Sequence, residues 1–455
     1  MHFFKKRLDT QSKVLLKNSS WVFFSNLFST GLAFLRGIVI ARGLGAELFG
    51  IYTVAVAFIA TVQEIFNLNL GAAVIRFGSQ YLSAGRNDKV VSILKLSLIS
   101  SAIASAVAFI AVAVLTALKY DSFIKQPGLT WFVLLYTVAA SSIFFNQVSR
   151  GALRLFFRFK TNAIIQMIMD IAEFALIVSA LFFYPGNLSV FMIAIIVSRF
   201  INGVVPNIAG FRELGPQLRS SAGAGIKLIK DQFSEIRKFV ITNSITKTLQ
   251  SLINTGDVLI LGVFTSSPVQ AAYYAVGKKL AYSLLTLTDP LVTSIYPQLC
   301  KLRDENKIKE ISNMLFRLTA LAAIPSALFL VIAFSLGDWI MKVVFGAEYA
   351  AAGPVFSILT AAALINAVFF WIQPLLQAID LLGMRLLTYA TGIVIGLGAA
   401  LFLVPRYGAE GMAFAIIAMN LVMPAMFLYF AIKKLRSESL FQHASNKPAD
   451  HAEED

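Results

Sequence analysis

The chain has 455 residues, of which 58% are hydrophobic and 14% charged, with a mean hydropathy of +0.75 and a formal net charge of +15. A chain this apolar cannot be buried in one soluble core of its size, so we expect an integral membrane protein. The single Cys300 excludes a disulfide framework, and all three histidines lie in polar terminal segments. We therefore expect no metal site in the membrane and no cofactor.

Twelve apolar stretches follow one another along the chain. Most are close to the roughly 20 residues that a helix needs to cross ~30 Å of hydrocarbon. The pattern predicts an all-α membrane protein with about twelve transmembrane helices in two six-helix repeats around a central cavity, as in many carriers. The predicted spans are 20–41, 48–70, 91–117, 129–149, 162–184, 187–208, 237–263, 269–297, 315–337, 354–378, 385–404 and 409–432.

The second set of spans echoes the first. Gly50–Ala55 parallels Ala272–Gly277, and Phe144–Phe145 parallels Phe369–Phe370. Because each half has six spans, the two repeats run parallel, related by an axis along the membrane normal. The predicted organisation is an N-terminal six-helix lobe (1–211), a cytoplasmic linker (212–236), a C-terminal six-helix lobe (237–436) and a disordered tail (437–455).

Lysine and arginine fall on alternate sides of the predicted spans. Basic residues precede the first span, follow the fourth as Arg150, Arg154, Arg158 and Lys160, and follow the last as Lys433–Arg436. The positive-inside rule then places both termini in the cytoplasm. The net charge is thereby explained by short connections beside anionic lipid, and we expect no nucleic-acid partner.

Polar residues inside the predicted spans mark the wetted interior, because a charge in the bilayer is costly. Span seven carries the clearest pattern: five polar residues in steps of four and three, which form one stripe along a helix. Isolated charges occur in spans one, two, five and eight. The stripe is Asn243, Lys247, Gln250, Asn254 and Asp257, and the other charges are Arg36, Glu64, Asp170, Glu173, Lys278 and Lys279.

Three segments resemble a known family. Ser29–Tyr52 is similar to the opening of Wzx-type polysaccharide-biosynthesis flippases, and Asp257–Gly262 with Tyr273–Val276 is similar to the start of their second half. These flippases belong to the multidrug/oligosaccharidyl-lipid/polysaccharide exporter superfamily, which also holds lipid II flippases. Arg36 matches a cavity arginine of the lipid II flippases, but Gly37 stands where they usually have Asp.

The resemblance implies a non-enzymatic flippase. Such a protein moves an undecaprenyl-pyrophosphate-linked oligosaccharide from the cytoplasmic to the outer leaflet of the bacterial inner membrane by alternating access, for surface polysaccharides such as O-antigen. Its implied partners are that substrate, membrane lipids and polysaccharide assembly proteins. In this interpretation Arg36, Lys247, Lys278 and Lys279 attract the anionic head, and Asn243, Gln250 and Asn254 contact sugar hydroxyls. Glu64, Asp170, Glu173 and Asp257 either carry coupling protons or pair with the basic residues.

Other interpretations stay open. The intramembrane polar residues also suit a purely structural role between helices. A cation-coupled multidrug or metabolite exporter predicts an acid-rich lumen without the lysines found here. A membrane oligosaccharide polymerase or ligase needs outward catalytic loops, whereas the predicted outward connections are short.

Overall fold

The computed structural model describes residues 10–123, 128–218, 221, 223–265, 267–283, 285, 288–305, 307–379, 381 and 383–445. The regular elements in these ranges are all helices. Eight helical segments of the described chain are long and apolar enough to cross a membrane by length and composition, and two of them each cover two predicted spans. The predicted all-α membrane fold is confirmed.

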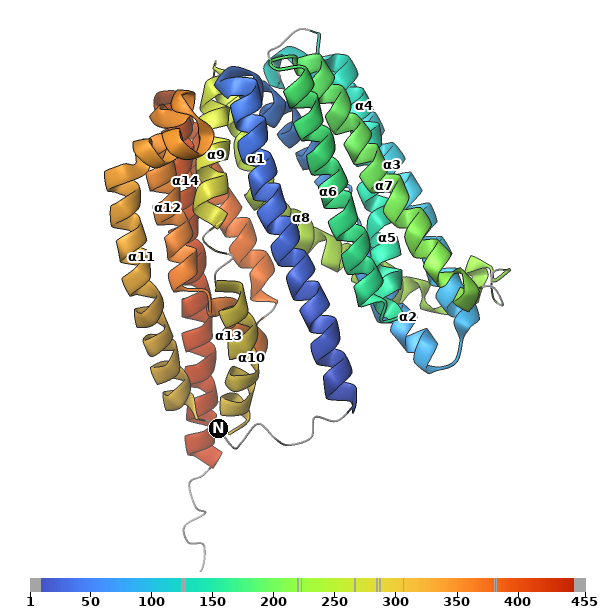
Figure 1. The fold of residues 1–455 in the computed structure, drawn as a ribbon. Coiled ribbons are helices and arrows are strands. Elements are labelled where there is room, and N and C mark those ends of the chain that lie inside the picture. The colour runs from blue at the N-terminus through green and yellow to red at the C-terminus, as the bar shows by residue number, and fades with distance from the viewer. Residues whose placement is uncertain are drawn as a thin grey trace, which may run out of the picture. The chain divides into compact units, whose positions relative to one another are not determined.

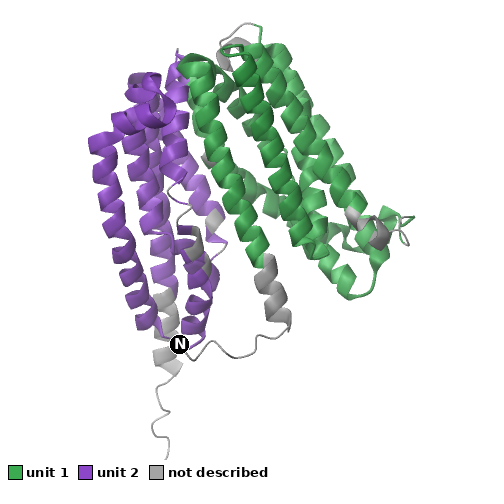
Figure 2. Cartoon of the chain, in the orientation of Figure 1, with its two compact units in different colours: residues 1–263 green, residues 264–455 purple. Residues whose placement is uncertain are grey.

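The chain divides into two compact units, residues 1–263 and 264–455 (Figure 2). Unit 1 holds α1 (Thr10–Ile65), α2 (Leu70–Ser83), α3 (Asn87–Phe123), α4 (Thr130–Ala140), α5 (Ser142–Leu155), α6 (Phe159–Phe183), α7 (Leu188–Leu218), the 3₁₀ helix η2 (Ile226–Gln232) and α8 (Phe233–Phe264), whose last residue lies just past the division. Unit 2 holds α9 (Pro268–Ser283), α10 (Asp289–Asp304), α11 (Ile308–Phe345), η4 (Ala347–Ala352), α12 (Gly353–Val368), α13 (Ile372–Ala378) and α14 (Met384–Ser445). Within unit 1, α1 packs along α6, and α6 along α7 (Figure 1).

Two long helices turn at a glycine. Inside α1, Gly45 has φ 74° and ψ 172°, and inside α14, Gly408 has φ 54° and ψ −126°. A side chain disfavours positive φ, so glycine is the residue that lets the backbone turn there. The two glycines fall between predicted spans one and two and between spans eleven and twelve. Helices α1 and α14 therefore each contain two of the predicted spans.

Four of the predicted spans are interrupted, at corresponding places in the two halves. The second span breaks at Asn69, where the backbone is left-handed, and the eighth breaks between α9 and α10. The fourth breaks at Ser141 and the tenth at Phe369–Trp371. Discontinuous helices are a recurrent feature of carrier sites, because their free ends present backbone dipoles to a cavity. The predicted spans did not include these breaks, although Thr130–Leu155 still forms one segment that is long and apolar enough to cross a membrane.

The structure departs from the predicted spans at three more places. In α8 the apolar segment found among the described side chains is Thr255–Phe264, which is shorter than the predicted span 237–263. Helix α7 continues to Leu218 and so enters the predicted linker. Helix α14 continues to Ser445, within the tail predicted to be disordered, and residues 446–455 lie outside the described part of the chain.

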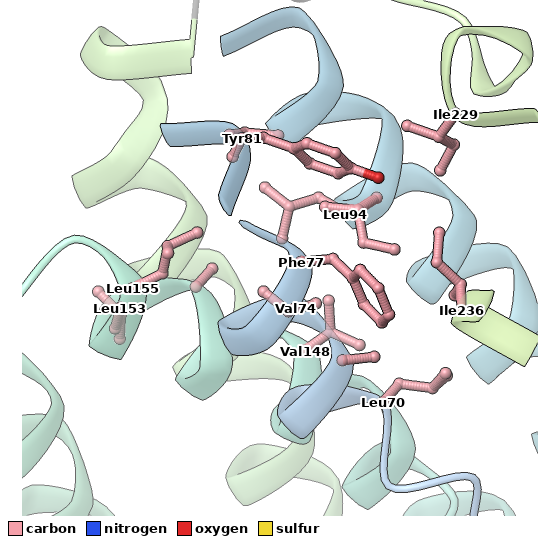
Figure 3. Close-up of a cluster of buried hydrophobic side chains, with 14 residues drawn as sticks. Leu70, Val74, Phe77, Tyr81, Leu94, Val148, Leu153, Leu155, Ile229 and Ile236 are labelled. Carbon is pink, nitrogen blue, oxygen red and sulfur yellow. The ribbon is translucent and has the colours of Figure 1, made fainter. Parts of the chain in front are cut away.

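A buried apolar cluster fixes η2 and the start of α8 to the rest of unit 1. The cluster contains Phe77 from α2, Leu94 from α3 and Val148 from α5, together with Ile229 from η2 and Ile236 from α8 (Figure 3). The linker backbone is also held to α3, because Lys95 Nζ donates to the Ala224 carbonyl over 2.9 Å. The predicted linker is thus packed against α3 by side chains and hydrogen bonds.

The packing of Ile229 predicts a stability effect. Ile229 is 1% exposed, whereas its neighbour Leu228 is 39% exposed. Ile229→Ala is expected to lower the free energy of unfolding by about 2–5 kcal/mol, since it removes buried methyl groups and leaves a cavity. Leu228→Ala is the matched control. Thermal melting of the purified protein in detergent measures both, and equal melting temperatures would contradict the packing.

Candidate substrate cavity

Unit 1 contains a polar cavity of about 530 Å³ between α1, α4, α5, α6 and α7. Three arginines and two carboxylates line it, a formal surplus of one positive charge. Amide and hydroxyl groups supply much of the remaining wall. The polar lining residues are Arg36, Gln63, Tyr136, Ser142, Asn146, Gln147, Arg150, Gln166, Asp170, Glu173, Arg199 and Asn202.

Glu173 is the centre of an ion-pair cluster in this cavity. Its side chain is 4% exposed, and its Oε2 lies 2.7 Å from Arg36 Nη1. Arg199 Nη2 lies 3.6 Å from the other carboxylate oxygen, and Asn202 donates to Oε2 over 3.0 Å. One carboxylate thus neutralises parts of two arginines, as a buried charge requires.

Asp170 lies one helical turn from Glu173 on α6. Gln166 Nε2 donates to its Oδ1 over 2.8 Å, and the Ser29 hydroxyl donates to its Oδ2. Both oxygens therefore have donors. Arg36 was predicted from span one, and Asp170 and Glu173 from span five, and the structure brings the three to one cavity.

Small residues let α5 and α7 approach closely and form the cavity wall. A side-chain carbon on Gly203 would lie 1.9 Å from Ser142, and one on Gly210 would lie 2.2 Å from the Ser149 hydroxyl. The contacts recur seven residues apart on both helices, so α5 and α7 run in the same direction, with small residues at the interface. Asn146 Nδ2 donates to the Asn202 carbonyl over 2.8 Å and adds a hydrogen bond between them.

The interruption between α4 and α5 is stabilised by Gln63 of α1. Gln63 Nε2 donates to the Thr137 carbonyl over 3.1 Å and to the Ser141 hydroxyl over 3.2 Å. The Thr137 carbonyl also accepts from the Ser141 amide over 2.9 Å, so Gln63 adds a further hydrogen bond to the last turn of α4. A cavity-lining amide thus helps to form the helix end that shapes the cavity.

Glu64 lies outside the cavity lining but is connected to it. Asn67 Nδ2 donates to Glu64 Oε2 over 3.1 Å, and Gln147 Nε2, from the cavity wall, donates to Asn67 Oδ1 over 3.0 Å. Thr248 of α8 donates to the Glu64 carbonyl over 3.1 Å. The end of α1 therefore joins the cavity wall to the polar helix α8.

The residues of the stripe on α8 are not among those lining this cavity. Asn243 has a buried Nδ2 without a hydrogen-bond partner among the described residues, while Lys247 and Gln250 are exposed. Asp257 is 3% exposed, and its Oδ1 accepts from the Val258 amide over 2.8 Å. The side chain of Asn254 lies outside the described part.

Lys278 and Lys279 lie on α9 of unit 2, and both are half-buried. The Lys278 ammonium lies 5.8 Å from the ring centre of Tyr274 and 5.9 Å from that of Tyr282. These are cation–π distances. The aromatic rings thus stabilise this lysine.

Two arginines of the cavity, Arg150 and Arg199, were not among the predicted site residues. Arg150 was assigned to the cytoplasmic connection after span four, but α5 continues to Leu155 and Arg150 lines the cavity. Arg199 was not singled out, although it is a charge near the middle of the predicted span 187–208. The rule that intramembrane charges mark a site would have found it.

The stripe on α8 gives a labelling prediction. In a Cys300→Ser background, a cysteine at Gln250 is expected to react with a water-soluble thiol reagent, because water favours the thiolate. A cysteine at Ile245, which is 48% exposed on another face of the helix, is expected to stay protected by lipid. Mass spectrometry of the labelled protein measures both. Equal reaction at the two sites would show that the stripe does not mark a wetted face.

Comparison with known proteins places the chain among membrane transporters. The family model described as polysaccharide biosynthesis protein matches residues 15–303. A curated relative, the probable low-salt glycan biosynthesis flippase Agl15 of Haloferax volcanii, is 25% identical over 420 residues, covering 91% of this chain and 83% of the relative.

Two solved structures share the fold. An inward-facing multidrug resistance MATE family transporter of the MOP superfamily matches with a TM-score of 0.67 and 13% identity, over 90% of this chain and 95% of that one. The lipid II flippase MurJ in an inward closed conformation matches with a TM-score of 0.66 and 15% identity, over 96% and 94%. The predicted resemblance to polysaccharide-biosynthesis flippases and the prediction of a non-enzymatic transporter are confirmed by the family match and the curated relative. The chain belongs to the polysaccharide biosynthesis protein family, and it has the fold of MATE transporters and MurJ.

Proposed function

We propose that this protein is a flippase that moves an undecaprenyl-pyrophosphate-linked oligosaccharide from the cytoplasmic to the outer leaflet, for polysaccharide assembly. The observation that carries the proposal is the cavity of unit 1, where arginines and amides are gathered inside an apolar helix bundle. A pyrophosphate-sugar head leaves water only if hydrogen bonds and counter-charge replace its hydration. The family and the glycan flippase among its relatives support this substrate class.

In this proposal the cavity binds the head while the polyprenyl tail stays in lipid. Arg36, Arg150 and Arg199 attract the pyrophosphate, and Asn146, Gln147 and Asn202 hydrogen-bond to sugar hydroxyls. Glu173 acts as an internal counter-ion that keeps two arginines paired in the empty site. The stripe residues and Lys278 and Lys279 contact the head at another stage of alternating access.

The proposed location is the cytoplasmic membrane, with both termini in the cytoplasm, where the basic connections meet anionic lipid. Export of an anionic head is then favoured by the interior-negative potential, by about 2.3 kcal/mol per charge per 100 mV. Glu64, Asp170, Glu173 and Asp257 remain the proposed sites for any coupling ion. Polysaccharide assembly proteins on the outer side are the proposed acceptors of the product.

Reconstitution tests the proposal directly. Proteoliposomes carrying the purified protein and a fluorescent undecaprenyl-pyrophosphate-linked oligosaccharide are expected to expose the probe to a membrane-impermeant quencher faster than empty liposomes. A deletion strain is expected to accumulate the lipid-linked intermediate inside the cell. Efflux of a cationic dye, without movement of the lipid probe, would instead assign the multidrug exporter function.

A further inference from the structure

A second cavity adjoins the polar one in unit 1. It is an apolar groove of about 360 Å³ between α3, α4, α5 and α7. Its apolar wall includes Leu98, Val138, Phe145, Phe200 and Phe211. Val138 is 54% exposed and Phe200 is 55% exposed, so the groove opens on the surface of the unit.

Ser142 lines both the groove and the polar cavity. It is the first residue of α5, directly after the break that ends α4. Gly203 of α7 packs against it without a side chain, at a distance that would place a Cβ 1.9 Å from Ser142. The wall beside the groove is therefore formed at this point by a serine and a glycine, which are two of the smallest residues.

An amide pair spans the same wall. Asn207 lines the groove and Asn146 lines the polar cavity, and Asn207 Nδ2 donates to Asn146 Oδ1 over 2.7 Å. The polarity of the lining changes across these two side chains, from charged on one side to aromatic and branched aliphatic on the other. A single molecule with an ionic head and an apolar tail matches both sides.

We propose that the groove binds the first isoprene units of the lipid-linked glycan whose head occupies the polar cavity; this rests on the proposed function. The groove volume lies at the low end of small-ligand pockets, which suits part of a tail and leaves the remainder in the bilayer. Apolar burial alone does not select a tail inside lipid, because the bilayer is equally apolar. Selection comes from the bound head, which holds its own tail at high effective concentration beside the groove.

Filling the groove tests the proposal. Val138→Trp places an indole where the tail would lie, and Val107→Trp is the matched control, at an exposed valine on α3 outside the groove. The probes are the same pyrophosphate-linked sugar on an undecaprenyl tail and on a short geranyl tail. Val138→Trp is expected to raise the KM for the undecaprenyl probe by about tenfold, a common effect of altered fit in an apolar pocket. The geranyl tail consists of the first isoprene units alone, so Val138→Trp is expected to raise the KM for the geranyl probe by a similar factor.

Photocrosslinking provides the second measurement and avoids a misfolded variant. Phe145 is replaced by benzoylphenylalanine in the full chain, and the lipid adduct is identified by mass spectrometry. An undecaprenyl adduct is expected, whereas adducts with glycerophospholipid alone would overturn the proposal. Equal KM values for Val138→Trp and Val107→Trp would also overturn it. If the unaltered protein moves neither probe, the proposed function fails as well, so the two failures are distinguishable.

Discussion

Replacing Glu173 with glutamine is expected to abolish transport and to destabilise the protein. The substitution removes the carboxylate that lies 2.7 Å from Arg36 and 3.6 Å from Arg199, and it leaves both guanidinium groups without their shared counter-ion. Removing one partner of a fully buried ion pair costs about 3–5 kcal/mol, and the cost here is expected to be smaller because the Arg36 and Arg199 side chains are 20% and 36% exposed. Glu235→Gln is the matched control, because Glu235 is exposed and its pair with Arg76, at 3.4 Å, contributes at most about 1 kcal/mol.

The double variant Arg36→Gln with Glu173→Gln separates structure from function. It removes the 2.7 Å pair without leaving Arg36 uncompensated, so much of the stability lost in the single variant should return. Partners in contact typically show interaction energies of about 0.5–3 kcal/mol. If Arg36 binds the substrate head, the double variant melts near the unaltered protein but does not transport. Recovery of both stability and transport would show that the pair serves packing alone.

The fold was largely predictable because membrane spans are long and their composition is extreme. A helix must satisfy its own backbone inside hydrocarbon, so an apolar stretch of sufficient length leaves few alternatives. The breaks at Ser141 and Asn69 were not predictable in the same way. They depend on tertiary partners, such as the hydrogen bonds that Gln63 gives to the end of α4.

The cavity was predictable only in part. Arg36, Asp170 and Glu173 break an apolar pattern and were recognised as intramembrane charges. Arg150 was not recognised as a cavity residue, because it falls at the end of an apolar stretch, where a basic residue is also typical of a cytoplasmic connection. Because α5 continues to Leu155, Arg150 lies within that helix and lines the cavity.

Arg150→Gln is expected to weaken binding of the pyrophosphate head while leaving the fold intact. Arg150 makes no hydrogen bond or ion pair with the described residues, yet it lines the cavity together with Asp170. It therefore has donors to offer an anion without first breaking an internal pair. Hydrogen bonds to charged groups contribute about 1.5–3 kcal/mol, so the loss corresponds to roughly 10- to 150-fold in affinity.

Arg154→Gln is the matched control for this variant. Arg154 lies one turn further along α5, is exposed and does not line the cavity. Thermal stabilisation by inorganic pyrophosphate, titrated at low and high salt, measures the difference between the two variants. The unaltered protein and Arg154→Gln should both be stabilised, with a response that weakens as salt screens the charge, and Arg150→Gln should respond little. An equal response from the two variants would place the anion elsewhere, because a charge that acts only at the membrane surface would not distinguish the cavity arginine from its exposed neighbour.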